Sequence, residues 1–278
     1  MKKILILLIM LFLAVPVFAV DKTSAEYLYN KKHFAPMNPL VECIAQKAIK
    51  KSLKKETGAK FKVKFEGYTL SSMKAGVFKN LEITGKNVTL EGVDVPYLKF
   101  KTLSEYNRID YTVDPVIVKS DMEFYYELHL SEKSINDALK SKEYKKSLQK
   151  VNKKAYPLFM INDVRAKIKN NKVYIIMDYN FPINPVGKNK TFMVSTNFAV
   201  VNGIIKARDI GIDSAYGNMP LDKVTNLINL LDPLSFTLDV VNAKKCKGKI
   251  ENVKIEDNIF QINGRMFVKG VNDVRKPD

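Results

Sequence analysis

The chain has 278 residues and carries 46 Lys and Arg against 29 Asp and Glu, a formal net charge of +17. Only five of the basic residues are Arg. Because proteins that read base sequence favour the bidentate Arg side chain, this composition argues against a nucleic-acid partner. Apolar residues make up 46% of the chain, which is enough for the core of one large domain or two small ones.

The first 19 residues have the order of a signal peptide. Lys2 and Lys3 form a positive start, residues 4–18 are apolar, and Ala19 ends a stretch suited to signal peptidase. The alternative is an uncleaved anchor, but a 15-residue run containing Pro16 is shorter than the roughly 20 residues of a spanning helix. We expect cleavage after Ala19, which removes two lysines and leaves a charge of +15. The expected location is periplasmic or extracellular.

A basic amphipathic helix is predicted after an irregular lead-in at residues 20–37. Asn38 is a typical N-cap, Pro39 suits the first helical position, and Gly58 follows the expected end. One face of this helix is apolar and the other is rich in lysine. The apolar residues are Leu40, Val41, Ile44, Ala45, Ala48, Ile49 and Leu53, and the basic residues are Lys47, Lys50, Lys51, Lys54 and Lys55.

Strands are predicted next, because apolar and polar residues begin to alternate. Residues 60–65 alternate without exception, as a strand with one buried face should. Further strands are expected at residues 67–73, 81–84, 88–90, 97–101, 108–113 and 116–130. In the last of these runs, one face holds Met122, Phe124, Tyr126, Leu128 and Leu130.

The second half of the chain is expected to alternate between helices and hairpins. Ser131 caps a second helix that runs to about residue 154, and Pro220 opens a third that ends near Leu231. A lone strand is expected at residues 234–240. Hairpins are predicted at residues 164–179, 191–212 and 249–269, around Asn170-Asn171, Asn202-Gly203 and Asp257-Asn258.

The pattern as a whole predicts an α+β fold. We expect a long, curved antiparallel sheet wrapped around the first amphipathic helix, with two further helices. No linker rich in Pro, Gly or Ser divides the chain, so residues 38–270 are interpreted as a single domain and residues 271–278 as a tail. The alternative is an ordinary α+β core that encloses no groove.

The sequence offers little catalytic apparatus. It contains no HExxH, CxxC, GxSxG or Walker motif, and neither of its two histidines, His33 and His129, lies in a ligand pattern. Asp121 and Glu123 could serve a glycosidase or bind calcium, but the solvated face of a strand explains them. We therefore expect no enzyme activity, cofactor or metal; a hydrolase that uses Asp121 or Asp209 is the alternative.

Cys43 and Cys246 are the only cysteines in the chain. An even pair in an oxidising compartment permits one disulfide bond. Cys43 lies in the first predicted helix and Cys246 among lysines, so two separate thiols are the alternative.

Several segments occur in a distinctive order along the chain. They are residues 58–65, 76–83, 92–100 and 128–139, the turn at 201–204 and the segment at 230–236. This order resembles the LmeA-like phospholipid-binding family of exported bacterial proteins, over about residues 39–270. Where that family has a late Leu-Pro-Phe-like segment, this chain has Leu234-Ser-Phe236, without the proline.

The resemblance implies a relative of tubular lipid-binding proteins, which hold phospholipid noncovalently in an apolar groove. Its implied partners are phospholipid and an anionic membrane surface, and it indicates no oligomeric state. The alternative is a non-enzymatic envelope scaffold or adhesion module with a solid core. Combined with the periodicity, the expected lipid-contacting residues are Ile44, Ala48, Lys51, Leu53, Lys55, Phe61, Val63, Phe65, Phe124 and Tyr126.

Overall fold

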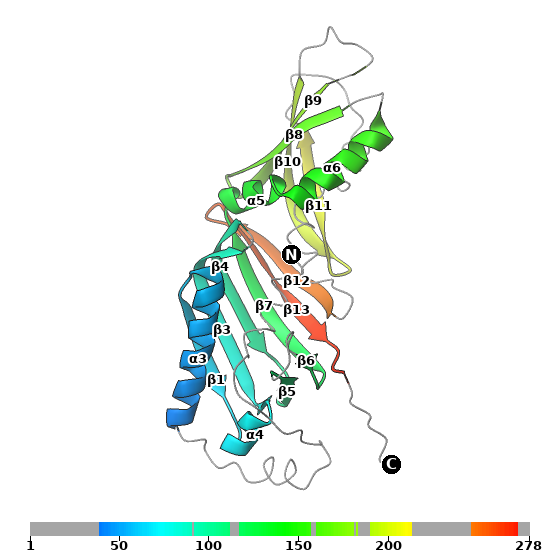
Figure 1. The fold of residues 1–278 in the computed structure, drawn as a ribbon. Coiled ribbons are helices and arrows are strands. Elements are labelled where there is room, and N and C mark those ends of the chain that lie inside the picture. The colour runs from blue at the N-terminus through cyan, green and yellow to red at the C-terminus, as the bar shows by residue number, and fades with distance from the viewer. Residues whose placement is uncertain are drawn as a thin grey trace.

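The computed structural model describes residues 39–90, 92–111, 117–156, 160–180, 182, 190–212 and 246–271. Within these ranges the fold is α+β, built from antiparallel sheets and four helices (Figure 1). The predicted α+β class is therefore confirmed. Several predicted features lie outside the described residues: the signal peptide at 1–19, the lead-in at 20–37, the helix at 220–231, the strand at 234–240 and the tail from 272.

The largest sheet has six antiparallel strands in the order β1-β3-β4-β7-β13-β12. The predicted alternation at residues 60–65 is confirmed, because Val63 and Phe65 are buried while Lys62 and Lys64 are exposed. The strands expected at 81–84 and 88–90 are parts of one strand. The six strands are β1 (Phe61–Glu66), β3 (Asn80–Leu90), β4 (Val93–Thr102), β7 (Met122–Leu130), β12 (Cys246–Glu256) and β13 (Ile259–Val268).

A second sheet has four antiparallel strands in the order β11-β10-β9-β8. The strands are β8 (Met160–Lys169), β9 (Lys172–Asn180), β10 (Lys190–Val201) and β11 (Ile204–Ile212). All three predicted hairpins are confirmed: two lie in this sheet, and the third joins β12 to β13. The reason is local, because both turn residues of each hairpin have φ between +50° and +77°. Two-residue turns of type I′ need this conformation, which Asn, Asp and Gly tolerate.

A short sheet of β2 (Val77–Phe78), β5 (Asn107–Asp110) and β6 (Ile117–Val118) lies near the end of the long strands (Figure 1). Two predictions are wrong here. The strand expected at 67–73 is replaced by helix α4 (Leu70–Lys74), because the Thr69 hydroxyl accepts a hydrogen bond from the Ser72 N–H at 3.1 Å and caps the helix. The run expected at 116–130 is split into β6 and β7, since the Ser120 hydroxyl accepts from the Arg108 N–H at 2.8 Å.

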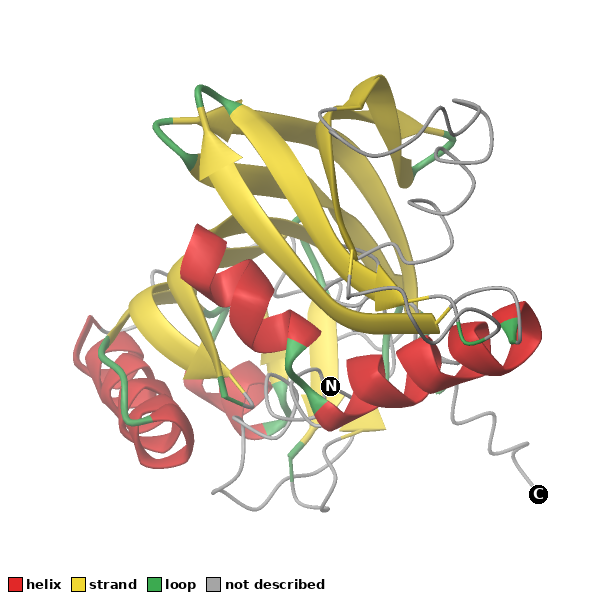
Figure 2. Ribbon diagram, turned by 90° about the horizontal axis from the view of Figure 1, so that it is seen from above, coloured by secondary structure: helices red, strands yellow, loops and turns green. Residues whose placement is uncertain are grey.

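Helix α3 (Pro39–Thr57) confirms the first predicted helix and packs against β1 and β3. The second predicted helix is instead two helices, α5 (Glu132–Leu139) and α6 (Lys142–Ala155). The break occurs because the Ser141 hydroxyl accepts from the Tyr144 N–H at 3.2 Å and caps a new helix. Figure 2 shows the helices along one side of the molecule and the long strands on the other.

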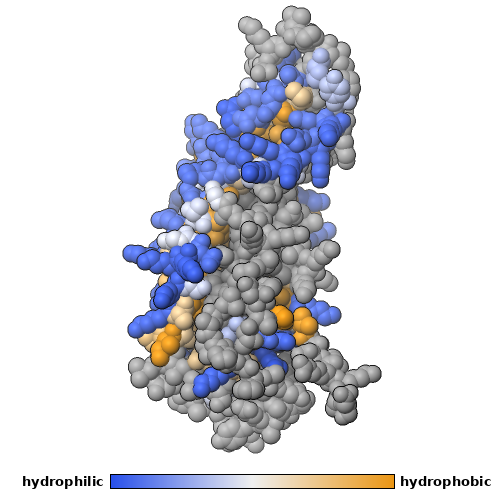
Figure 3. Space-filling view, viewed as in Figure 1, coloured by the Kyte–Doolittle hydropathy of each residue, from blue (hydrophilic) through white to orange (hydrophobic). Residues whose placement is uncertain are grey.

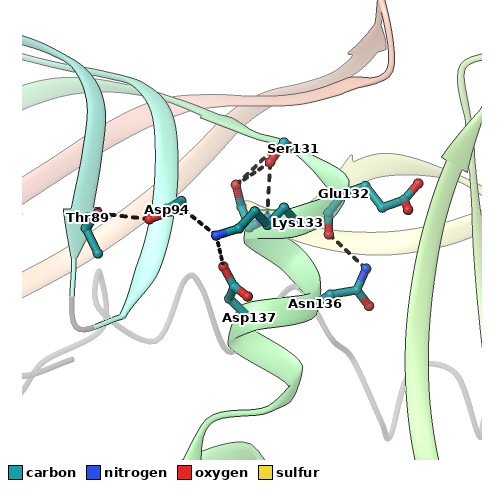
Figure 4. Close-up of polar contacts among 8 residues, drawn as sticks. Thr89, Asp94, Ser131, Glu132, Lys133, Asn136 and Asp137 are labelled. Carbon is teal, nitrogen blue, oxygen red and sulfur yellow. Dashed lines mark hydrogen bonds and ion pairs between the residues drawn. The ribbon is translucent and has the colours of Figure 1, made fainter.

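Helix α5 connects the two large sheets (Figure 4). On one side, the Lys133 ammonium forms an ion pair with Asp94 on β4. On the other side, the Asn136 side chain donates to the Ala166 carbonyl of β8 at 2.8 Å and accepts from the Ala166 N–H at 2.9 Å. The helix therefore takes the place of a further strand beside β8.

The buried apolar side chains of the two sheets form one continuous cluster. The ring of Phe198 on β10 packs edge-on against Phe260 on β13, with the ring centroids 5.4 Å apart. Beside this contact, the Ile250 N–H of β12 donates to the carbonyl of Gly203 in the β10–β11 turn at 3.3 Å. The apolar interior thus runs from one sheet into the other.

Candidate functional site

One face of the six-stranded sheet carries a continuous apolar surface, which we call the inner face. Directly opposed residues of neighbouring antiparallel strands point to the same side, so the register defines rows across the sheet. The middle row crosses all six strands and consists of Val63, Ile83, Phe100, Tyr126, Gly264 and Ile250.

Two further rows flank the middle row on the inner face. One consists of Phe61, Gly85, Leu98, Leu128, Ile262 and Val253. The other consists of Phe65, Leu81, Thr102, Phe124, Met266 and Gly248. The hydroxyl of Thr102 in this row is satisfied, because it accepts from the Leu81 N–H at 2.9 Å. The three rows therefore form an apolar floor with very few polar atoms.

Burial is uneven over the inner face. The middle of the face is closely covered, since Val63, Ile83 and Tyr126 are only 1–2% exposed. Other apolar side chains in the same rows are half-buried: Phe61, Phe100, Phe124, Leu128 and Val253. Because well-packed cores bury such residues almost completely, these positions mark where another apolar surface could add contacts.

Two glycines allow aromatic side chains to lie flat along this floor. A Cβ added to Gly85 would lie 2.7 Å from the Phe61 ring, and one added to Gly264 would lie 2.7 Å from the Tyr126 hydroxyl. Each aromatic side chain therefore crosses a neighbouring strand where that strand has no side chain. A larger residue at either glycine would push the aromatic ring away from the sheet.

The hydroxyl of Tyr126 is buried without a hydrogen-bond partner. Burial raises the pKa of this hydroxyl well above its usual value, and the Glu251 carboxylate adds to the rise. The group therefore stays neutral and can donate a hydrogen bond. Buried polar groups are nearly always paired in proteins, so this unpaired donor is an exception within the inner face.

Helix α3 places only part of its predicted apolar stripe against the sheet. Ile49 and Leu53 are buried in the same cluster as β1. Ile44 is 65% exposed and Ala48 is also exposed, so the expectation that these two residues line the groove is wrong. The reason is geometric: the main contacts of α3 with the described strands are to β1 and β3 at the edge of the sheet, which cover one narrow stripe of the helix.

The two lysines expected at the mouth of the groove, Lys51 and Lys55, lie on the outward side of α3 and are exposed. Neither forms an ion pair with any residue in the described part of the chain. Of the other expected contact residues, Leu53, Val63, Phe65 and Tyr126 are buried, and Phe61 and Phe124 are half-buried. All of these except Leu53 belong to the three rows of the inner face.

Sequence reasoning missed Phe100, Leu128 and Ile262, which complete the rows. Their alternation with polar neighbours was a usable signal for the inner face. It also missed a polar cluster on the opposite, outer face, where the Tyr97 ring lies 4.7 Å from the His129 ring. That cluster could not be found from one strand, because the two rings come from neighbouring strands, β4 and β7.

The acids and the histidine considered for chemistry have structural partners. Asp121 accepts a hydrogen bond from the Gly270 N–H at 2.9 Å, and Nε2 of His129 lies 2.8 Å from a carboxylate oxygen of Glu127. Asp209 is exposed with φ +50°, beside the irregularity where β10 pairs with β11. Within the described ranges, no three His, Cys, Asp or Glu side chains gather as a metal site.

The expected disulfide between Cys43 and Cys246 is not formed. Cys43 is a free, exposed thiol on α3. Helix α3 packs beside β1, whereas Cys246 begins β12 at the opposite edge of the six-stranded sheet. Five strand spacings of about 4.8 Å separate those edges, far more than the roughly 7 Å that a disulfide can bridge between Cα atoms.

In the described part of the chain, none of the helices has the length and hydrophobicity needed to cross a membrane. No family model matches the sequence, and comparisons with curated proteins and with solved structures find no significant match.

Proposed function

We propose that this protein is an exported phospholipid-binding protein that holds acyl chains noncovalently against the inner face. The observation that carries the proposal is the apolar surface of three rows across six strands, on which Phe61, Phe100 and Phe124 are only half-buried. Five strand spacings make this face about 24 Å wide, longer than the roughly 15 Å that an acyl chain spans in half of a bilayer core.

In this proposal the sheet curls toward α3, which forms one wall of the groove through Ile49 and Leu53. The half-buried aromatic side chains would complete their burial against the acyl chain. Each methylene group removed from water contributes about 0.8 kcal/mol, so the two acyl chains of a phospholipid can be held without any covalent step.

The proposed partners are phospholipid and an anionic membrane surface, and the proposed location is periplasmic or extracellular. The location rests on the signal-peptide pattern of residues 1–19. The membrane partner rests on Lys51 and Lys55, which are exposed and form no ion pair with the described residues. No catalytic step is part of the proposal.

A non-enzymatic envelope scaffold or adhesion module is the second candidate. It is favoured by the depth of burial of Val63, Ile83 and Tyr126, which are as inaccessible as the centre of a solid core. The two candidates differ in what covers the half-buried residues: lipid in the first, and only solvent or protein in the second.

Lipid extraction tests the proposal. The protein is purified without detergent, and its co-purifying lipids are identified by mass spectrometry. We expect phospholipid in a fixed ratio to protein, and we expect Leu128→Trp to lower that ratio severalfold because the indole fills the space beside Phe100. Val164→Met is a matched control inside the second sheet. A lipid-free protein that also fails to take up lipid from phosphatidylglycerol vesicles would favour the scaffold.

A further inference from the structure

The two most exposed large apolar side chains of the described residues lie on two different helices. They are Ile44 on α3 and Tyr156 at the C-terminal end of α6, and each is 65% exposed. Both helices are rich in lysine. Single exposed apolar residues are common on protein surfaces, so it is the charged surroundings that make these two informative.

The lysines around these two residues are not neutralised. On α3 the outward lysines are Lys47, Lys51, Lys54 and Lys55, and on α6 they are Lys142, Lys145, Lys146, Lys150 and Lys153. None of them forms an ion pair with a described residue. Some lysines on the strands do have acidic partners, since Lys64 and Lys99 share Glu82 and Lys254 pairs with Glu256 at 2.8 Å. Each of the two helices therefore presents a group of exposed lysines without an acidic partner among the described residues.

Helical spacing aligns the apolar residue and the lysines on one side of each helix. Ile44, Ala48, Lys51 and Lys55 follow the intervals i, i+4, i+7 and i+11 on α3. Lys146, Lys150 and Lys153 follow the same spacing on α6, with Tyr156 one turn further on. The buried residues Ile49 and Leu53 of α3 and Tyr144 of α6 occupy the other side of each helix.

Both helices lie on the same side of the molecule. In Figure 1, α3 and α6 pass in front of the strands, and Figure 2 shows both on the side away from the long strands. Figure 3 shows hydrophilic side chains over both helices on that same face. The two helices therefore lie on a common side of the described part of the molecule.

We propose that α3 and α6 form one docking face for an anionic phospholipid bilayer, with Ile44 and Tyr156 entering the head-group region. This inference rests on the proposed function for the choice of partner. Tyrosine favours the membrane interface, and each lysine near an anionic surface strengthens binding about fivefold. A protein partner would need a contiguous contact of about 1,000 Å² or more, whereas two separated apolar residues amid lysines suit a flat charged surface.

Binding to vesicles tests the docking face. The α3 variant combines Ile44→Ser, Lys47→Glu and Lys51→Glu, and the α6 variant combines Tyr156→Ser, Lys146→Glu and Lys150→Glu. We expect each to sediment at least tenfold more weakly with phosphatidylglycerol vesicles, and the combined variant not to bind. Lys167→Glu with Lys169→Glu, on exposed positions of β8, makes the same change in charge and should have a much smaller effect. An equal loss in that control would overturn the docking face.

A fluorescent label then reports the orientation. Cys43 is a free exposed thiol next to Ile44, so it can carry an environment-sensitive dye once Cys246→Ser is introduced. A second protein carries the dye at Tyr156→Cys, and a third at Lys62→Cys on the opposite side of β1, both with the native cysteines replaced by Ser. We expect the first two labels to brighten and to be quenched by nitroxide lipids, and the third to stay unchanged. A response from only one helix label, or from all three, would contradict docking through both helices.

These results are separable from the proposed function. Lipid content measured by mass spectrometry on the single variants Ile44→Ser and Tyr156→Ser should match that of the parent, because both side chains lie away from the inner face. Helix labels that respond in a protein without bound lipid would support docking and reject lipid carriage. Bound lipid with unresponsive labels would support lipid carriage and reject docking through the two helices.

Discussion

One row in the middle of each large sheet is buried to a different extent. In the four-stranded sheet, the row formed by Ala166, Ile175 and Val194 is 0–4% exposed. In the six-stranded sheet, the middle row contains residues of 1–2% exposure beside the half-buried Phe100. Both sheets obey the same strand alternation, so the strands alone do not produce the difference.

The covering helices produce the difference. Helices α5 and α6 place Ile135, Leu139 and Tyr144, each at most 5% exposed, in the common core beside the four-stranded sheet. Helix α3 contributes Ile49 and Leu53 at one edge of a wider sheet. An apolar sheet face therefore becomes a candidate binding surface when the helix packed on that face is too narrow to cover it.

The largest expected effect comes from introducing tryptophan into each sheet. Ile175→Trp adds volume to a closely packed row and should lower the free energy of unfolding by about 3 kcal/mol. Leu128→Trp adds similar volume at a half-buried position and should cost less than about 1 kcal/mol. Urea unfolding of both variants beside the parent measures the contrast.

The same pair of variants can break the comparison. Equal losses would mean that the six-stranded sheet is as solid as the four-stranded one, which favours the scaffold. A lipid-loaded parent adds a further check. Removal of the lipid should lower the free energy of unfolding of the parent more than it lowers that of the Leu128→Trp variant. A ligand that binds only the folded state stabilises it by mass action, and a variant that cannot bind lacks that gain.

A second expected effect concerns the edge of the four-stranded sheet. Asn136 makes two hydrogen bonds with the backbone of Ala166, and Asn152 makes two with Ile161, at 2.8 and 2.9 Å in each pair. Asn136→Ala leaves the outward N–H and C=O of β8 unpaired and should cost about 2 kcal/mol. Urea unfolding measures the loss, and hydrogen exchange at the Ala166 amide locates it.

Asn252→Ala serves as the control for this edge. Asn252 is exposed on β12, so its replacement should change stability by less than about 0.5 kcal/mol. If exchange at Ala166 is the same in Asn136→Ala as in the parent, the helix does not substitute for a strand. The solidity of the four-stranded sheet would then come from its apolar contacts alone.

Local patterns were sufficient to predict much of the fold. The hairpins follow from turn pairs such as Asn202-Gly203, whose positive φ is nearly independent of the rest of the molecule. The first helix follows from Pro39 and Gly58 at its ends. The failures also have local causes that alternation cannot show: the hydroxyls of Thr69 and Ser141 start helices where the apolar pattern predicted a strand or an unbroken helix.

The candidate site was only partly predictable. Alternation placed Phe61, Val63, Phe65 and Tyr126 on the correct face, since a strand has two sides only. It could not tell which part of the apolar stripe of α3 meets the sheet, so Ile44 was assigned to the wrong side. Alternation also could not show the three rows of the inner face, because these depend on which strands become neighbours and in what register.

The smallest expected effect concerns the joint between the sheets, where Lys133 on α5 pairs with Asp94 on β4. The hydrogen bond from Lys133, and then that from Thr89, lowers the pKa of Asp94, while Asp94 and then Asp137 raise the pKa of Lys133. The lowered pKa means that the stabilisation is present above about pH 4 and is lost as pH falls through the folded-state value. The raised pKa of Lys133 means that the stabilisation from this ion pair is present below about pH 10 and is lost as pH rises further.

Replacing Lys133 should therefore matter near neutral pH and not in acid. Lys133→Met is expected to lower the urea midpoint slightly at about pH 7 and to leave it unchanged once the pH lies below the lowered folded-state pKa of Asp94. The effect should shrink in salt, because both side chains of the pair are exposed. Lys140→Met, at an exposed position at the end of α5, is the control. A difference that persists in acid would show that the Lys133 stem acts by packing, so that α5 is fixed to both sheets by apolar contact.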